Sequence, residues 1–166
     1  MSKIINQKFI LYFILLGFLG CATQLSHLKQ VRACTAKNQF QQAAEVIKQN
    51  NARYGERDRV LYHLDRGILF LYAGDFDQAI EYLTIAEKEM LELFTKSISK
   101  EAASLVTNEY VLPYVGLDYE QILVNAFLAL AYAGKRNYND ALVEVRKADT
   151  KFKLLKEKHA KSEKGI

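Results

Sequence analysis

The chain has 166 residues, of which 50% are hydrophobic and 25% are charged. These proportions are typical of a folded globular protein and argue against a disordered chain. The formal net charge is +4, but Lys3 and Lys8 lie in the leader described below, and the remainder is too nearly balanced to indicate nucleic-acid binding. The chain has one proline and eight glycines, and so few helix breakers favour helices over a many-stranded sheet.

The first residues follow the order of a secretory signal. Lys3 and Lys8 come before an uninterrupted apolar run over residues 9–19, which is too short to span a bilayer comfortably. The run ends at Gly20 and Cys21, and a small residue directly before such a cysteine resembles the lipobox of bacterial lipoproteins. The resemblance implies that a signal peptide of residues 1–20 is removed and that Cys21 is the site of lipid attachment. The alternative is an uncleaved signal anchor with a chance cysteine.

Lipidation at Cys21 would make the membrane a partner of the protein. Several acyl chains on one residue give a stable anchor, since each buried methylene adds about 0.8 kcal/mol of membrane affinity. In enteric lipoproteins an aspartate after the cysteine favours the inner membrane, so Ala22 implies by this resemblance an outer-membrane protein of the cell envelope that faces the periplasm. Cys34, the other cysteine, is expected to be a buried thiol, with an intermolecular disulfide as the alternative.

The stretch over residues 60–88 predicts two helices joined by a short turn. Apolar residues recur at helical spacing on both sides of Gly74 and Asp75, which interrupt the pattern. Asp75 stands where its side chain can cap the second helix. The small residues Gly67 and Ala79 indicate that the two helices approach closely. Such a hairpin has an apolar face that another hairpin must cover.

An aromatic residue followed three positions later by alanine marks the start of a second helix three times. The pairs are Phe40 and Ala43, Phe76 and Ala79, and Tyr138 and Ala141. The series resembles the tetratricopeptide repeat, which implies an all-α fold of antiparallel helical hairpins stacked as a short α-solenoid. Two departures from the repeat are Arg66, where leucine is usual, and Asn125, where a bulky apolar residue is usual.

The repeats divide the chain into regions. Residues 21–56 would hold the lipidated N-terminus and a weak first hairpin, residues 57–160 the tetratricopeptide-like domain, and residues 161–166 a flexible tail. The alanines are 36 residues apart between the first two copies and 62 apart between the next two, so an insertion is placed at about residues 95–119. The helix before it is expected to run on toward Ile98. Three tyrosines of the insertion are candidate partner contacts: Tyr110, Tyr114 and Tyr119.

The lipobox, the tyrosine-rich loop and the helix after it together resemble a group of poorly characterised bacterial envelope lipoproteins. The resemblance covers about residues 57–152. Members of that group continue into further repeats. We therefore expect this chain to be a shortened member or a truncated reading frame.

The resemblance also implies a binding groove, because the first helix of each repeat lines the groove of the family. Transferred here, the groove residues are Leu61, Leu64, Ile68, Tyr72, Leu123, Ala126, Leu130 and Ala133. They are unusually apolar, which favours an apolar peptide ligand or burial by further repeats or a second copy of the chain. The predicted function is that of a non-enzymatic, lipid-anchored periplasmic scaffold that binds a protein partner.

The sequence lacks the patterns that build common catalytic sites. No nucleophile elbow, phosphate loop, HExxH or paired CxxC occurs, and the three histidines lie on different segments. No cofactor and no metal are therefore expected, and His63 is expected to be a packed side chain. One alternative function is a regulator of cell-wall synthesis or outer-membrane assembly. A second, which no residue pattern favours, is an envelope enzyme acting on glycan.

Overall fold

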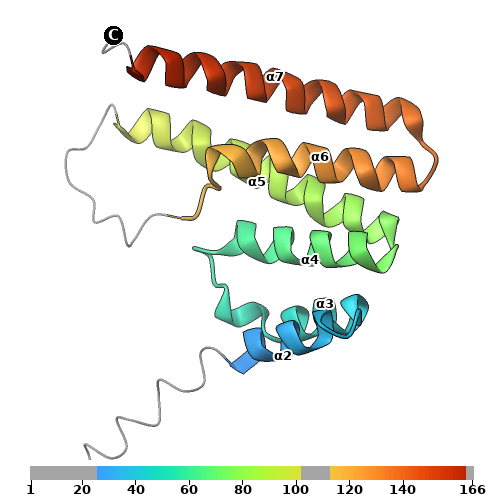
Figure 1. Cartoon of the computed structure of the whole chain (residues 1–166). Helices are drawn as coiled ribbons and strands as arrows, with labels where there is room; N and C mark the ends of the chain where they lie inside the picture. The colour runs from blue at the N-terminus through green and yellow to red at the C-terminus, as the bar shows by residue number, and fades with distance from the viewer. Residues whose placement is uncertain (1–25, 102–112, 164–166) are drawn as a thin grey trace, which may run out of the picture.

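The computed structural model describes residues 26–101 and 113–163, and within these ranges the protein is all-helical (Figure 1). Cys21 and Tyr110 lie outside the described residues, as do the leader and residues 164–166. The helices are α2 (Ser26–Thr35), α3 (Phe40–Gln49), α4 (Arg59–Ala73), α5 (Phe76–Glu101), α6 (Asp118–Gly134) and α7 (Tyr138–Glu163), with a short 3-10 turn η1 (Asn51–Arg53). The all-α prediction is thus confirmed for the described part of the chain.

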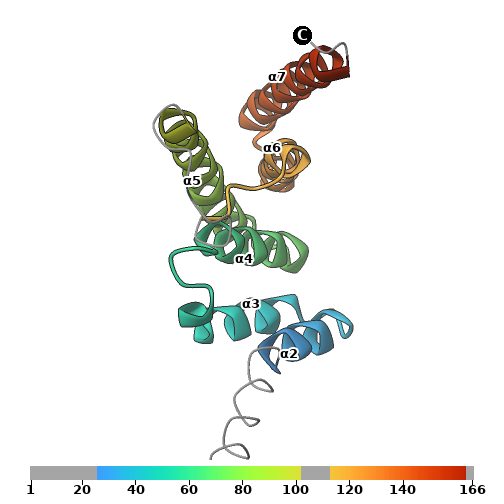
Figure 2. The same cartoon turned by 90° about the vertical axis from the view of Figure 1, so that its left-hand side faces the viewer.

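Each helix packs against the next one in the chain. The contacts run α2 on α3, α3 on α4, α4 on α5, α5 on α6 and α6 on α7, and α4 also touches α6. The helices of the pairs α4–α5 and α6–α7 run antiparallel, and the pairs follow one another from α2 to α7 (Figures 1 and 2). Because α5 packs on α6, these two hairpins share a core and are not independent units.

Three of the turns between helices have the same backbone. Each contains one residue with positive φ, namely Asn38 (58°), Gly74 (78°) and Arg136 (60°). In each, the next N–H donates to the carbonyl five residues back, at 2.9 Å from Gln39 to Cys34, 3.0 Å from Asp75 to Phe70 and 2.9 Å from Asn137 to Tyr132. This arrangement satisfies carbonyls that the helix end would otherwise leave unpaired.

The helices after the last two of these turns also begin alike. The backbone N–H of Gln78 donates to Asp75 Oδ1 at 3.2 Å, which confirms the predicted cap of α5. The backbone N–H of Asp140 donates to Asn137 Oδ1 at 3.4 Å at the start of α7. The repeated sequence pattern therefore corresponds to a repeated local structure.

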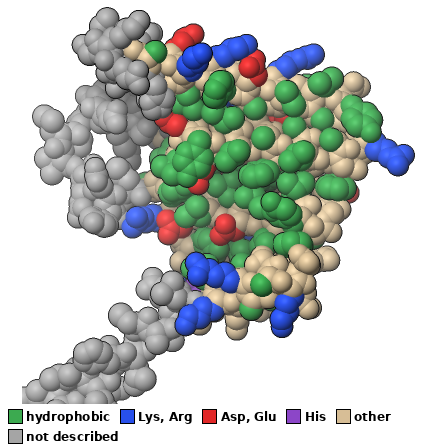
Figure 3. All heavy atoms as spheres, viewed as in Figure 1, with side chains coloured by type: hydrophobic (Ala, Val, Ile, Leu, Met, Phe, Trp, Pro, Cys, Tyr) green, Lys and Arg blue, Asp and Glu red, His purple; other side chains and the backbone are tan. Residues whose placement is uncertain are grey.

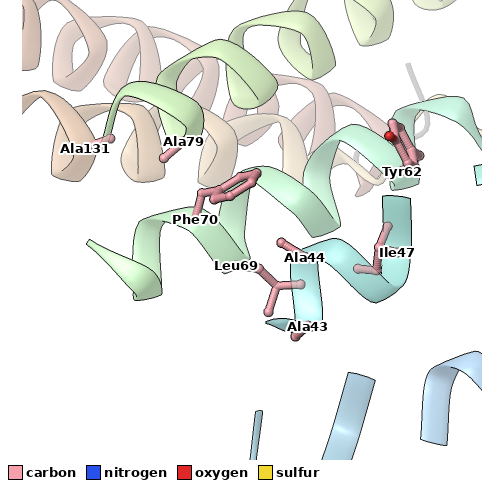
Figure 4. Close-up of a cluster of buried hydrophobic side chains, with 8 residues drawn as sticks. All are labelled: Ala43, Ala44, Ile47, Tyr62, Leu69, Phe70, Ala79 and Ala131. Atoms are coloured by element: carbon pink, nitrogen blue, oxygen red, sulfur yellow. The ribbon is translucent and has the colours of Figure 1, made fainter. Parts of the chain in front are cut away.

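The core consists of two adjoining clusters of buried side chains. The first joins α3, α4, α5 and α6 and is drawn in Figure 4: Ala43, Ala44, Ile47, Tyr62, Leu69, Phe70, Ala79 and Ala131. The second joins α4, α5 and α6: Val60, Leu64, Leu83, Ala86, Met90, Val124 and Leu128. A Cβ added to Gly67 would lie 2.7 Å from Leu83 Cγ, so the predicted close approach of α4 and α5 is confirmed.

The segment between helices α5 and α6 is shorter than the predicted insertion at about residues 95–119. Helix α5 runs through Ile98 to Glu101, as the continuing apolar stripe predicted, so the residues from 95 to 101 are helical. At the other end α6 begins at Asp118, inside the predicted insertion. Of the segment between these helices, the structure describes residues 113–117, where Gly116 adopts a φ of 86°. A Cβ added to Gly116 would lie 2.7 Å from Met90 Cε. The loop therefore packs closely against α5 at a residue of the second core cluster.

Candidate binding surface

Three of the predicted groove residues are exposed on the first helices of their hairpins. Tyr72 is 63% exposed on α4, and Leu123 and Leu130 are 42% and 58% exposed on α6. Leu123 and Leu130 are seven residues apart, so they lie on the same side of α6, two turns from each other. Figure 3 shows hydrophobic side chains gathered over the part of the molecule where Figure 1 places α6. Leu123 and Leu130 thus form an exposed apolar surface on α6, and Tyr72 is exposed on α4.

The other predicted groove residues are less accessible. Leu61, Ile68, Ala126 and Ala133 are half-buried. Leu64 is 7% exposed and belongs to the second core cluster, because its side of α4 faces α5 and α6. We therefore assign Leu64 to the interior and do not retain it as a contact residue.

The two described tyrosines of the predicted insertion, Tyr114 and Tyr119, differ in exposure. Tyr114 is half-buried beside the second core cluster, and its hydroxyl donates to Glu120 Oε2. Burial and this bond raise the pKa of Tyr114 well above its usual range. Glu120 Oε2 also accepts the backbone N–H of Leu117 at 2.7 Å, which stabilises the start of α6. Tyr119 is 57% exposed and remains a candidate contact.

A buried polar network joins α5, α6 and α7, and sequence reasoning missed it. Asn125 is fully buried, and its Nδ2 donates to Glu87 Oε1 at 2.7 Å and to Glu144 Oε2 at 2.6 Å. Lys147 pairs with Glu144 at 2.8 Å, and Lys151 pairs with Glu87 at 3.0 Å. The one signal in the sequence was Asn125 itself, which stands where the repeat usually has a bulky apolar residue.

The network also perturbs the carboxyl group of Glu87. Burial raises its pKa, but hydrogen bonds from Asn125 and Lys151 and the charges of Lys151 and Lys147 outweigh burial. The pKa of Glu87 is consequently lowered from its ordinary value. This carboxylate therefore favours the assembled state of the two hairpins when it is ionised.

The burial of Arg66, a charged residue, is explained by its aromatic neighbours. Its side chain is only 5% exposed, and its Nη1 donates to the hydroxyls of Tyr62, at 3.1 Å, and Tyr82. Its guanidinium carbon lies 4.2 Å from the ring centroid of Tyr82 and 5.2 Å from that of Phe70. Arg66 also lines an open pocket of about 760 Å³ that carries both acidic and basic side chains, among them Glu45. Arg66 thus replaces the leucine that is usual in the repeat, and aromatic rings and hydroxyls surround its charged group.

His63 and Cys34 both pack against other side chains of the domain. His63 packs between the rings of Tyr62 and Tyr82, and its Nε2 lies 3.7 Å from Glu89 Oε1. Burial, with the charge of Arg59, lowers the pKa of His63. Cys34 is a half-buried free thiol against the first core cluster. No group of three or more potential metal ligands occurs among the described residues.

One side of α7 carries four apolar side chains that are exposed among the described residues. Each residue of α5 corresponds to the residue 62 positions later in α7, since Phe76 and Tyr138 open the two helices. Four exposed side chains on one side of α7 form what we call the α7 stripe: Tyr138 (63% exposed), Leu142 (53%), Val145 (51%) and Phe152 (57%). Their counterparts in α5 are buried or half-buried: Phe76, Ile80, Leu83 (0%) and Met90 (3%).

Comparison with known proteins gives no assignment. No protein-family model, curated protein or solved structure matches the chain. Among the residues that the structure describes, no helix is both long enough and apolar enough to span a bilayer.

Proposed function

We propose that this chain is a lipid-anchored scaffold of the bacterial cell envelope that binds a protein partner on its first helices. The observation that carries the proposal is the exposed apolar surface at Leu123 and Leu130 of α6, with Tyr72 of α4. Exposed apolar side chains two turns apart are the anchors that an apolar helix or an extended peptide contacts. The Arg66 cage and the Asn125 network lie inside the same domain and hold the helices that present this surface.

The stacking part of the proposal is a short tetratricopeptide-like solenoid. Its support is that second helices touch the next hairpin in the same manner. The ring of Phe40 stacks on Tyr72 with centroids 5.3 Å apart. The ring of Phe76 lies over Gly134, where an added Cβ would come 2.4 Å from Cζ. Tyr72 and Gly134 each stand two residues before the positive-φ residue of their turn.

The anchor places this scaffold at a membrane surface. Four residues separate Cys21 from Ser26, the first residue of α2. Five Cα-to-Cα steps span at most about 18 Å. A lipid on Cys21 would therefore hold the helical domain close to the headgroups, which we expect to be those of the outer membrane on its periplasmic side.

Photo-crosslinking in living cells tests the binding surface. Benzoylphenylalanine at Leu130 is expected to give a covalent adduct with a specific protein, identified by mass spectrometry. The same probe at Leu91, which is 65% exposed on α5, is the matched control and is expected to give no such adduct. Equal adducts at both positions, or none at Leu130, would contradict the proposal.

The anchor is tested separately by Cys21→Ser. We expect this variant to lose labelling by radioactive palmitate and to leave the membrane fraction. If labelling and fractionation are unchanged, the anchor is wrong, whatever the crosslinking shows.

A further inference from the structure

A small pocket between α2 and α4 holds one acidic side chain. Its volume is about 250 Å³, and apolar side chains form most of its wall, with Leu28 and Val31 from α2 and Ile68 and Leu69 from α4. Asp65 of α4 is the one acidic residue among the described residues that line it. The pocket therefore combines an apolar wall with a single negative charge.

The carboxylate of Asp65 has a hydrogen bond that holds it in place and no ion pair. The hydroxyl of Tyr54 donates to Asp65 Oδ2 at 2.8 Å. Within the described part of the chain Asp65 pairs with no lysine or arginine, whereas Glu87 pairs with Lys151 and Lys147. A carboxylate among apolar side chains is stabilised by a cation brought beside it.

The neighbouring bases do not replace such a cation. Burial raises the pKa of Asp65, and the hydrogen bond from Tyr54 and the charge of His27 lower it without outweighing burial. Arg32 also lines the pocket, but it is exposed, so water and salt screen its charge. The half-buried carboxylate of Asp65 thus lacks a direct counter-charge.

The pocket lies on the side of α4 that carries Tyr72 of the candidate binding surface. Asp65 precedes Ile68 by three residues and Tyr72 by seven, so the three follow one side of the helix. Ile68 is a predicted groove residue and lines the pocket, and Tyr72 is 63% exposed. A partner in contact with Tyr72 is only about 11 Å along the helix from Asp65.

The size of the pocket suits a single side chain. Pockets for drug-sized molecules commonly measure roughly 300–1,000 Å³, and this one is smaller. Lysine and arginine carry a cation at the end of an apolar stem, and the stem packs along apolar surface. We propose that the pocket at Asp65 binds the cationic end of a lysine or arginine side chain of the protein partner. This assignment rests on the proposed function and adds that the partner presents a basic residue beside its apolar contacts.

A nuclear magnetic resonance titration of the full chain in nonionic detergent micelles tests the pocket. The probe is n-butylammonium, which has the stem and the charge of a lysine side chain. We expect it to shift the amide signals of Leu28 and Leu69 with a dissociation constant of about 1–10 mM. n-Butanol has the same stem without the charge and should bind at least roughly fivefold more weakly.

Two aspartate variants separate the charge of the pocket from the charge of the whole protein. Asp65→Asn keeps an oxygen that can accept the Tyr54 hydroxyl and should weaken n-butylammonium binding at least roughly fivefold. Asp149→Asn removes the same charge from an exposed position on α7 and should change the binding less than about twofold. Circular dichroism verifies the helical fold of both variants.

A third variant leaves the half-buried carboxylate in place and decides the matter if Asp65→Asn does not fold. Arg32→Gln removes an exposed cation from the pocket and should tighten n-butylammonium binding about twofold. The pocket assignment is overturned if n-butylammonium shifts neither signal up to about 50 mM, if n-butanol binds equally well, or if a folded Asp65→Asn variant binds as the parent chain does.

Crosslinking in living cells tests whether the cation comes from the partner. With benzoylphenylalanine at Leu130, Asp65→Asn should lower the yield of the specific adduct at least roughly fivefold, while Asp149→Asn should leave it unchanged. An equal yield in both variants would overturn the assignment to the partner. If the parent chain gives no adduct at Leu130, the partner surface itself is wrong, and the titration still decides whether the pocket binds a cation.

Discussion

The hairpins α4–α5 and α6–α7 have turns of the same geometry and differ in the helices that surround them. Both turns have the same positive-φ residue, the same hydrogen bond five residues back and the same side-chain cap. Yet Leu83 of α5 is 0% exposed, while its counterpart Val145 of α7 is 51% exposed. The same local pattern thus builds the core in one hairpin and a surface in the other. The neighbour decides which role an apolar side chain takes.

The largest expected effect of this difference is on stability. Leu83→Ala removes a fully buried side chain from the second core cluster, and we expect it to lower the free energy of unfolding by about 2–5 kcal/mol. Val145→Ala at the counterpart position should cost less than about 1 kcal/mol, because Val145 is half exposed. Urea unfolding measures both. Equal costs would contradict the comparison.

A second effect concerns the close approach of α4 and α5. Gly67→Ala gains helix propensity, but its Cβ would lie 2.7 Å from Leu83 Cγ and 3.1 Å from the Leu83 backbone nitrogen. Since the backbone must shift, we expect a net loss of about 1–3 kcal/mol in thermal or urea unfolding. The counterpart in α6 is Ala129, where the structure already accommodates a Cβ. A stabilised Gly67→Ala variant would show that the hairpin is looser than described.

The stabilising effects of two half-buried carboxylates of α5, Glu87 and Glu89, should respond to pH with opposite signs. Glu87 reaches the second hairpin and has a lowered pKa, so its stabilisation is present above the unfolded pKa of about 4.3 and is lost as pH falls through the lower folded value. Glu89 stays within the first hairpin, near Arg59 and His63, and burial raises its pKa. Ionised Glu89 therefore opposes folding at neutral pH.

Glutamine variants measure this contrast. We expect Glu87→Gln to lower the free energy of unfolding at pH 7 by about 1 kcal/mol and to flatten its fall between pH 5 and 3. Glu89→Gln should leave stability at pH 7 unchanged or slightly higher. Urea titrations at a series of pH values are the measurement. An equal loss of unfolding free energy in both variants would mean that the contacts of Glu87 with the second hairpin do not stabilise the protein more than the contacts of Glu89 do.

The smallest effect is expected where the hairpins are most alike. Asp75→Ala and Asn137→Ala each remove one side-chain cap and should each cost about 0.5–1 kcal/mol. Asp75→Asn and Asn137→Asp keep an acceptor oxygen and serve as controls. Urea unfolding measures the cost. A much larger cost at one turn would show that the two caps stabilise the protein unequally although their geometry is the same.

Local features of the fold were predictable from the sequence, and features that depend on neighbours were not. The helical spacing, the cap at Asp75 and the small residue at Gly67 are local or involve two adjacent helices. The inward position of Leu64 depends on α6, which is more than fifty residues away in the sequence. Periodicity alone places Leu64 on the apolar side of α4 without saying which helix covers it.

The polar interior shows the same limit. Arg66 departs from the repeat pattern, and only the folded chain brings the hydroxyls of Tyr62 and Tyr82 to it. Asn125 likewise finds Glu87 and Glu144 on two other helices. A buried polar group has to be paired, but the sequence does not say with which residue. The exposed α7 stripe was hardest to predict, because its residues match those that are buried in α5.

The most direct test of the contrast between α5 and α7 is hydrogen–deuterium exchange of the full chain in micelles. We predict that peptides covering residues 76–90 of α5 exchange more slowly than peptides covering residues 138–152 of α7, because apolar side chains that are buried on α5 have exposed counterparts on α7. Equal exchange in the two helices, or slower exchange in α7, would contradict the account.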